Sequence, residues 1–212
     1  MGKAMAITLA LAGAAQADEV TIAALGDSLT QGFGLVQEEG FVPQLEAWLR
    51  DRGHDLTVLN AGVSGDTTAG GLARVGWTLT PEVDAMIVAL GGNDLLRGLP
   101  PETSRANLEG ILQAAEAAGV EVLLIGLTAP GNYGPEWQAA FDAMYPELAE
   151  AYGTIYAESF LGALSAATED DPGAVARYMQ ADGIHPNAAG VALIVEDLGP
   201  QVEELVGRVA AE

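Results

Sequence analysis

The strongest constraint on the fold of this chain is the alternation of short apolar runs with longer segments of helical periodicity. Apolar runs of strand length occur at residues 20–25, 56–60, 83–90, 120–127 and 154–157. Helical spacing is found at residues 41–51, 67–78, 102–118, 137–152 and 187–210. Strands that alternate with helices of this length indicate a parallel sheet covered on both faces. We therefore expect an α/β fold, a flavodoxin-like three-layer α/β/α sandwich with about five parallel strands flanked by helices.

Two parts of the chain are harder to interpret. Pro146 is expected to kink or end the helix at 137–152, and Gly199-Pro200 predicts a break or shift in the last helix. Residues 159–182 show no clear period, so we expect short helical pieces at most.

The composition limits the classes of partner. The chain of 212 residues has 8 Lys and Arg against 30 Asp and Glu, a net charge of −22, and no cysteine. This balance argues against nucleic acid, whose binding requires cations that neutralise phosphates, and against docking on anionic lipid. We interpret the acidic residues as a solvated, self-repelling surface. Disulfides and thiol nucleophiles are excluded.

The N-terminus has the pattern of a signal peptide. Lys3 precedes an uncharged apolar run at 4–15, and Ala15-Gln16-Ala17 fits a small-x-small cleavage site. The run is too short to span a bilayer, so we expect no stable membrane insertion. The prediction is a signal peptide at 1–17 and a single domain at 18–212, periplasmic or secreted after cleavage near Ala17. A frayed N-terminal helix and a cloning remnant are the alternatives.

A nucleophile candidate follows the first predicted strand. The stretch Gly26-Asp27-Ser28-Leu29 presents the Ser28 hydroxyl just past the carboxyl end of that strand, where ligands bind in open parallel sheets. A serine in a glycine-rich turn is also common turn chemistry, so Ser28 needs support from the rest of the chain.

That support comes from three later stretches. The second strand ends near Gly62, the third near Asn93, and Asp182-Gly183-Ile184-His185-Pro186 precedes the last helix. A serine nucleophile needs a base, which His185 could provide, and the base needs an orienting group, for which Asp182 is close in sequence. The backbone N–H groups of Ser28 and Gly62 and the side-chain amide of Asn93 would converge on a developing oxyanion if the first three strands are adjacent.

In order, these stretches resemble the four sequence blocks of the GDSL or SGNH hydrolase family. The short length and Asn132-Tyr133-Gly134 are most similar to its bacterial thioesterase, lysophospholipase and arylesterase branch. The resemblance implies a catalytic triad and an oxyanion hole at the same positions that the chemistry of the residues indicates. The triad is Ser28 as nucleophile, His185 as base and Asp182 as its orienter; the oxyanion hole is Ser28, Gly62 and Asn93.

The expected activity is hydrolysis of carboxylic esters by an acyl-enzyme mechanism, without cofactor or metal. Small-molecule aryl and short- to medium-chain acyl esters are the expected substrates, with thioesters and lysophospholipids as further candidates. An acyl pocket could be lined by apolar residues near the mouth, although the same residues are equally consistent with ordinary packing under loops: Leu29, Phe33, Leu35, Leu95 and Tyr133.

One alternative activity remains open, two other classes lack the residues they require, and the sequence leaves the oligomeric state undetermined. The same site would suit an O-deacetylase of carbohydrates or cell-wall glycans. A metal site could use acidic residues and His185, but their scatter lacks ligand spacing: Asp27, Asp66, Asp94 and Asp182. A flavodoxin-like binding or phospho-receiver module would require a lysine or a phosphate-cradling G-x-G-x-x-G loop, and residues 18–212 contain neither.

Overall fold

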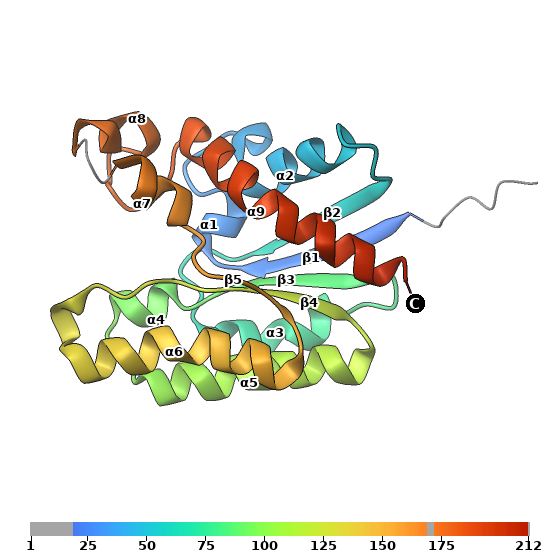
Figure 1. The fold of residues 1–212 in the computed structure, drawn as a ribbon, viewed down its shortest axis with the longest axis horizontal. Helices are drawn as coiled ribbons and strands as arrows, with labels where there is room; N and C mark the ends of the chain where they lie inside the picture. The colour runs from blue at the N-terminus through green and yellow to red at the C-terminus, as the bar shows by residue number, and fades with distance from the viewer. Residues whose placement is uncertain (1–18, 169–171, 212) are drawn as a thin grey trace, which may run out of the picture.

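The architecture is built on one sheet of five parallel strands in the order β2-β1-β3-β4-β5 (Figure 1). The computed structural model describes residues 19–168 and 172–211. The predicted fold class, an α/β sandwich with about five parallel strands, is confirmed. The strands are β1 (Val20–Gly26), β2 (Leu56–Gly62), β3 (Ala85–Ala89), β4 (Glu121–Ile125) and β5 (Ile155–Ala157).

Helices cover both faces of this sheet. The longer ones are α2 (Phe41–Arg50), α3 (Thr68–Thr78), α5 (Pro101–Ala118), α6 (Pro135–Tyr152) and α9 (Ala188–Val209). The shorter ones are α1 (Ser28–Gln31), α4 (Gly92–Leu96), α7 (Gly162–Thr168) and α8 (Val175–Tyr178). Single 3-10 turns lie at η1 (Gln37–Glu39), η2 (Gly131–Tyr133) and η3 (Pro172–Ala174).

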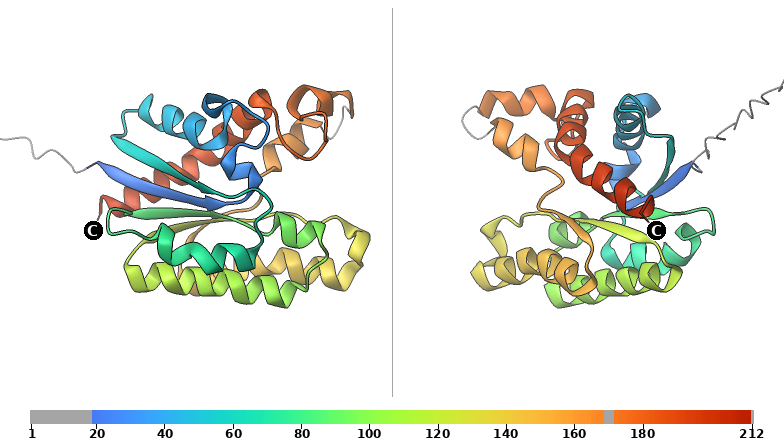
Figure 2. Two further views of the ribbon diagram at one scale, coloured as in Figure 1. Left: turned by 180° about the vertical axis from the view of Figure 1, so that it is seen from behind. Right: turned by 45° about the vertical axis from the view of Figure 1, so that its right-hand side comes forward.

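The two faces of the sheet have separate apolar cores, because successive side chains of a strand point to opposite faces. In β1, Ile22 and Ala24 pack in the core beneath α2 and α9, whereas Ala23 and Leu25 pack in the core beneath α3, α5 and α6. Figures 1 and 2 show these two groups of helices on opposite sides of the sheet. A strand buried on both faces must be apolar throughout, which explains the continuous runs in the sequence.

The last helix corrects one prediction. The expected break at Gly199-Pro200 is wrong, because α9 runs unbroken with Pro200 inside it. Proline removes one helical N–H donor, but the apolar face of α9 stays packed on α2. A Cβ atom on Gly199 would lie only 2.5 Å from Cη2 of Trp48, so glycine permits this close approach. Pro146 likewise lies inside α6 without ending it.

The helices α1 and α4 are not predicted from the sequence, since four or five residues are too few to show a helical period. Short helical pieces are found within 159–182, as predicted, at α7, η3 and α8. The predicted signal peptide at 1–17 lies outside the described residues. In the described part of the chain, no helix combines the length and apolarity needed to cross a bilayer.

The sheet creates a crevice between the carboxyl ends of β1 and β3. These adjacent strands lead into helices on opposite faces, since β1 continues towards α2 and β3 towards α5. Where neighbouring parallel strands lead to helices on opposite faces, a crevice opens outside the strand ends. Ser28 follows β1 and Asn93 follows β3, so both residues lie at its rim.

The outer edge of β2 is partly occupied by side chains of α2. The backbone N–H of Val58 donates to Glu46 Oε2 at 2.8 Å. The carbonyl oxygen of Leu56 accepts from Arg50 Nε at 3.0 Å and Nη2 at 2.8 Å. Glu46 and Arg50 also lie within 3.3 Å of each other as an ion pair. Two backbone groups that would otherwise be free at the sheet edge are thereby satisfied.

Candidate active site

Ser28, His185 and Asp182 form a continuous hydrogen-bonded chain. The Ser28 Oγ atom lies 2.9 Å from His185 Nε2, and His185 Nδ1 lies 2.7 Å from Asp182 Oδ2. Ser28 is the first residue of α1, and the other two lie in the loop between α8 and α9. The structure thus brings together the three residues singled out from the sequence. An imidazole in this position can accept the serine proton while the carboxylate fixes its orientation.

The loop from Asp182 to His185 is a tight turn closed by the Asp182 carboxylate. Its Oδ1 atom accepts from the backbone N–H of Ile184 at 2.9 Å and of His185 at 3.1 Å. Gly183 adopts φ = 68°, a left-handed conformation that favours glycine. The bond with His185, followed by the backbone bonds, lowers the pKa of the Asp182 carboxyl from 3.8 to about 2. Asp182 is therefore ionised at neutral pH.

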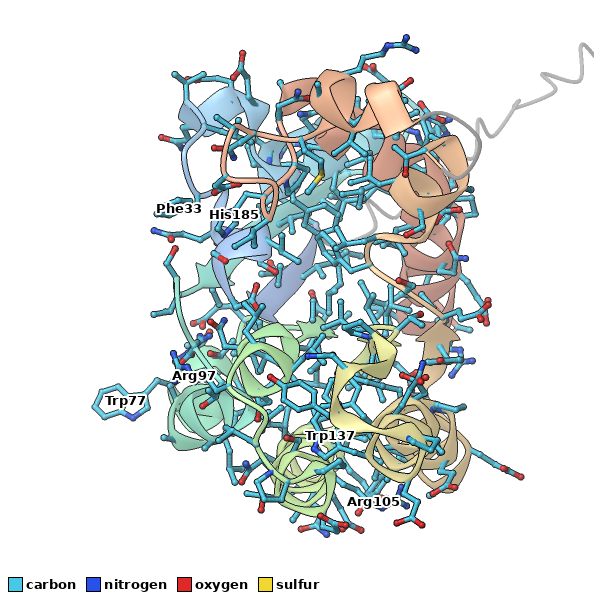
Figure 3. All side chains as sticks on the ribbon, turned by 90° about the vertical axis from the view of Figure 1, so that its left-hand side faces the viewer. Phe33, Trp77, Arg97, Arg105, Trp137 and His185 are labelled. Atoms are coloured by element: carbon cyan, nitrogen blue, oxygen red, sulfur yellow. The ribbon has the colours of Figure 1, made fainter. Side chains whose placement is uncertain are left out.

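Gln180 fastens this loop to its surroundings. Its backbone N–H donates to the His185 carbonyl at 2.8 Å. Its side-chain Nε2 donates to the carbonyl oxygens of Pro186 at 2.9 Å and Phe33 at 2.7 Å. The Phe33 ring lies against the imidazole, with centroids 4.7 Å apart (Figure 3). These contacts restrict the position of His185 relative to α1.

Asp27 shapes the turn that presents Ser28. It is the N-cap of α1, and its Oδ1 atom accepts from the Leu29 N–H at 3.0 Å. Its Oδ2 atom accepts a longer bond, 3.3 Å, from Asn93 Nδ2. The residue is buried, and burial raises the pKa of its carboxyl because the charged form is disfavoured there. These contacts give Asp27 a structural role in the turn.

The structure does not place Gly62 where the predicted oxyanion hole requires it. Its backbone N–H donates to Asn60 Oδ1 at 3.0 Å. A Cβ atom on Gly62 would lie 2.3 Å from the backbone nitrogen of Gln31 and 2.9 Å from the carbonyl oxygen of Asp27. Glycine is needed here because α1 packs directly on the end of β2. Gly62 is also not among the residues that line the pocket at Ser28, which contradicts its predicted role as an oxyanion donor.

The structure brings Gly65, which is not among the residues predicted from the sequence, to the pocket at Ser28. It lines the pocket at Ser28 and adopts φ = 80°. Within the described residues, no acceptor is bonded to its backbone N–H. The signal was present in Ser64-Gly65-Asp66, since a glycine directly before a helix-capping segment is where a left-handed turn is expected. Thr67 is the N-cap of α3, so the turn at Gly65 directs the chain into that helix.

Asn93 reaches the same pocket from the first turn of α4. Its Nδ2 atom donates to the Asp66 carbonyl at 2.9 Å, in addition to the long bond to Asp27. The first bond fixes the amide against the loop that carries Gly65. The second is near the limit of hydrogen-bond length, so a substrate oxyanion can compete for that N–H.

Arg74 ties the strand ends beneath the pocket together. From α3, its Nη2 donates to the Gly26 carbonyl at 2.8 Å and its Nη1 to the Ala61 carbonyl at 2.6 Å. Its Nε donates to Asp66 Oδ2 at 2.6 Å. One guanidinium therefore joins the end of β1, the end of β2 and the loop that holds Asn93.

A pocket of about 360 Å³ opens over Ser28. Leu29, Phe33 and Leu95 of the predicted acyl pocket lie in its wall. Further apolar lining comes from Leu96, Leu127, Leu161 and Ile184. The chamber is apolar around a small polar group at Ser28, which is typical of small-molecule sites.

Tyr133 and Leu35 do not line this pocket. Tyr133 packs on Gly98, where a Cβ atom would meet its ring at 2.8 Å, and its ring centroid lies 4.8 Å from that of Trp137. Leu35 lines a larger hollow of about 760 Å³ beside α2 and β2. That hollow contains none of the triad residues, so its size does not mark it as the reactive site.

The acidic residues near the pocket are bonded to protein donors. Buried Asp94 accepts from the Thr68 backbone N–H at 2.9 Å, the Thr68 hydroxyl at 2.6 Å and the Ser104 hydroxyl at 2.9 Å. It thereby joins α3, α4 and α5. Among the described residues, no group of three or more His, Asp or Glu side chains is arranged to hold a metal ion.

Several known proteins are similar to this chain in sequence and in fold. Residues 24–193 match the GDSL-like lipase/acylhydrolase family. A relative named Esterase TesA, from Pseudomonas aeruginosa, is 40% identical over 192 residues, which cover 90% of this chain and 92% of the relative. Thioesterase 1/protease 1/lysophospholipase L1 of Escherichia coli is 36% identical over 197 residues, covering 92% and 88%. The crystal structure of AlinE4, an SGNH-hydrolase family esterase, matches this fold with a TM-score of 0.70. The two sequences are 41% identical, and the match covers 89% of this chain and 97% of that one.

The low pKa of Asp182 predicts an acid-dependent loss of stability. Because the pKa is about 2 in the folded protein and 3.8 ordinarily, the stabilising contribution is present above about pH 4 and is lost as the pH falls towards 2. We expect the difference in unfolding free energy between the wild type and Asp182→Asn to be smaller at about pH 3 than at about pH 5. Urea unfolding measures this difference, and a gap that widens on acidification would contradict it.

Proposed function

The chain belongs to the GDSL-like lipase/acylhydrolase family, and from this premise we propose how its residues carry out ester hydrolysis. It is a carboxylic ester hydrolase. The observation that carries the mechanism is the 2.9 Å contact between Ser28 Oγ and His185 Nε2, continued at 2.7 Å to Asp182.

In the first half-reaction, Ser28 Oγ attacks the carbonyl carbon of the ester while its proton passes to His185 Nε2. Asp182 accepts the hydrogen bond from Nδ1 and stabilises the imidazolium that forms. When the tetrahedral intermediate collapses, the bond to the alcohol oxygen breaks and His185 protonates that leaving group. A water molecule then attacks the acyl-enzyme, with His185 again acting as base.

We assign the oxyanion hole to the backbone N–H groups of Ser28 and Gly65 and to Asn93 Nδ2. The support for Gly65 is its place in the pocket wall together with its unpartnered N–H among the described residues. Because Asn93 also bonds the loop next to Gly65, the donors are held in place before the substrate arrives. Such preorganised donors stabilise the charge that develops in the transition state.

The apolar wall of the pocket favours esters with a hydrocarbon acyl or aryl group. Leu29, Leu95 and Leu161 belong to this wall, and its volume of about 360 Å³ suits short- to medium-chain groups. Thioesters and lysophospholipids meet the same chemical requirement at the carbonyl. We therefore propose small-molecule acyl esters as the substrates.

Replacing Ser28 with alanine tests the nucleophile. We expect Ser28→Ala to lower kcat on p-nitrophenyl butyrate by about four to six orders of magnitude, since among the described residues Ser28 carries the hydroxyl that is bonded to His185 Nε2. Ser165→Ala, on exposed α7, is the matched control and should retain wild-type activity. Full activity of Ser28→Ala would reject this mechanism.

The acyl series from p-nitrophenyl acetate to palmitate extends the same experiment. Turnover should be highest for short to medium chains and fall for palmitate, because the pocket is small. Activity confined to acetylated sugars would instead favour an O-deacetylase.

Replacing Asn93 tests the oxyanion hole. Asn93→Ala should lower kcat by about 10²–10³-fold, with a much smaller change in KM, because the amide binds charge that is present only in the transition state. Asn132→Ala, in the exposed loop at η2, removes an asparagine outside the pocket and should have no such effect. An equal rise in KM with unchanged kcat would show that Asn93 only binds substrate.

We also propose that the protein is exported. The support is the sequence pattern at 1–17, which predicts a mature single domain at 18–212 in the periplasm or outside the cell. Mass spectrometry of the exported protein should give a first residue directly after Ala17. An intact Lys3 in that protein would contradict cleavage.

A further inference from the structure

Positive charge is scarce in this protein, and most of it is paired. The chain has 8 Lys and Arg against 30 Asp and Glu. Most arginines of the described residues lie within ion-pair distance of a carboxylate: Arg50, Arg52, Arg74, Arg105 and Arg208.

Arg97 and Arg177 differ from these five, because no carboxylate of the described residues lies within ion-pair distance of either one, and of the two only Arg97 contacts a residue of the pocket wall. Arg97 is the exposed C-cap of α4, and its Nη2 atom donates to the Gly65 carbonyl at 2.8 Å. A guanidinium has five N–H donors in a planar fork. One contact to a carbonyl leaves most of them directed to solvent, with the charge uncompensated.

Arg97 stands at the mouth of the active-site pocket. Both its partner Gly65 and its chain neighbour Leu96 line the pocket together with Ser28. Figure 3, which looks onto the carboxyl ends of the strands, shows Arg97 on the face that also carries His185 and Phe33. The contact to Gly65 holds the guanidinium beside the rim, so an anion there would not have to order a free side chain.

The acidic residues around the pocket already have partners. The Asp66 carboxylate is bonded to Arg74, Asp182 to His185, and Asp94 to hydroxyl and backbone donors. Asp27 is buried and caps α1. These carboxylates are therefore engaged elsewhere, and the charge of Arg97 is available to a ligand.

We propose that Arg97 binds an anionic group, a carboxylate or phosphate, on the part of the ester substrate that stays outside the pocket. This rests on the proposed function, because the ester carbonyl must lie at Ser28. Guanidinium suits these anions, since its paired N–H groups match two oxygens of either one. In a protein of net charge −22, which repels anions at long range, this contact gives anionic esters a local attraction at the site.

The test uses two esters that differ in charge only at the leaving group. They are 3-nitro-4-butyryloxybenzoate, which carries a carboxylate, and the corresponding neutral 3-nitro-4-butyryloxybenzamide. Both release a coloured nitrophenolate, so kcat and KM are measured in the same way for the wild type, Arg97→Gln and Arg97→Lys. Arg177→Gln, on exposed α8 and outside the pocket wall, removes one positive charge elsewhere as the matched control.

The expected result is a loss confined to the anionic ester. Arg97→Gln should lower kcat/KM for the benzoate by about tenfold, mainly through KM, because a hydrogen bond to a charged group is lost. The benzamide should change by less than about twofold, Arg97→Lys should recover part of the loss, and Arg177→Gln should match the wild type. Added salt should lower the ratio of kcat/KM for the benzoate to kcat/KM for the benzamide in the wild type, because screening weakens an exposed contact between charges.

Other results overturn the inference in distinguishable ways. Equal losses on both esters would show that Arg97 acts only by holding Gly65, and no loss on either would show no role at all. In both cases, continued hydrolysis of the butyryl ester in the benzamide compound would leave the proposed function intact. If the wild type hydrolyses neither ester, the proposed function fails and this inference fails with it.

Discussion

The burial of β1 on both faces is the constraint on which the site depends. Its side chains alternate between the two apolar cores, so the strand cannot shift along its axis without moving residues out of both. β2 and β3 pair with it on either side. The residues just past its end, including Ser28, therefore have a fixed position relative to the ends of the neighbouring strands. The hydrogen bonds of Arg74 to the Gly26 and Ala61 carbonyls strengthen this arrangement at the strand ends.

The sheet and the hydrogen-bonded residues Ser28, His185 and Asp182 could be predicted from the sequence, because both leave local signals. A doubly buried strand is a continuous apolar run, and a loop Asp-x-x-His before a helix can close on itself through the aspartate. Gly62 was misassigned because a glycine that permits close packing and a glycine that exposes a backbone N–H look alike in sequence. Only the contacts to Gln31 and Asn60 separate the two roles. The place of Tyr133 against Gly98 depends on how two distant loops meet, which no local pattern records.

The two carboxyl groups near Ser28, those of Asp182 and Asp27, lie in different environments. Asp182 is exposed and bonded to His185, so its carboxyl stays ionised beside the imidazole. Asp27 is buried, and the raised pKa of its carboxyl reflects the cost of a charge there. Two carboxyl groups near one serine thus have different environments and different roles. The one next to His185 can stabilise a positive charge on the imidazole, and the other maintains the turn that presents Ser28.

The side chains of α2 on the edge of β2 also affect how copies of the protein meet. An open edge strand offers a row of unpaired N–H and C=O groups to which another chain can add a strand. Glu46 and Arg50 bind the Val58 N–H and the Leu56 carbonyl, so a neighbouring strand would have to displace both. At the opposite edge, β5 has only three residues and offers a short ladder. The sheet on which the site is built is thus protected from aggregation through its edges.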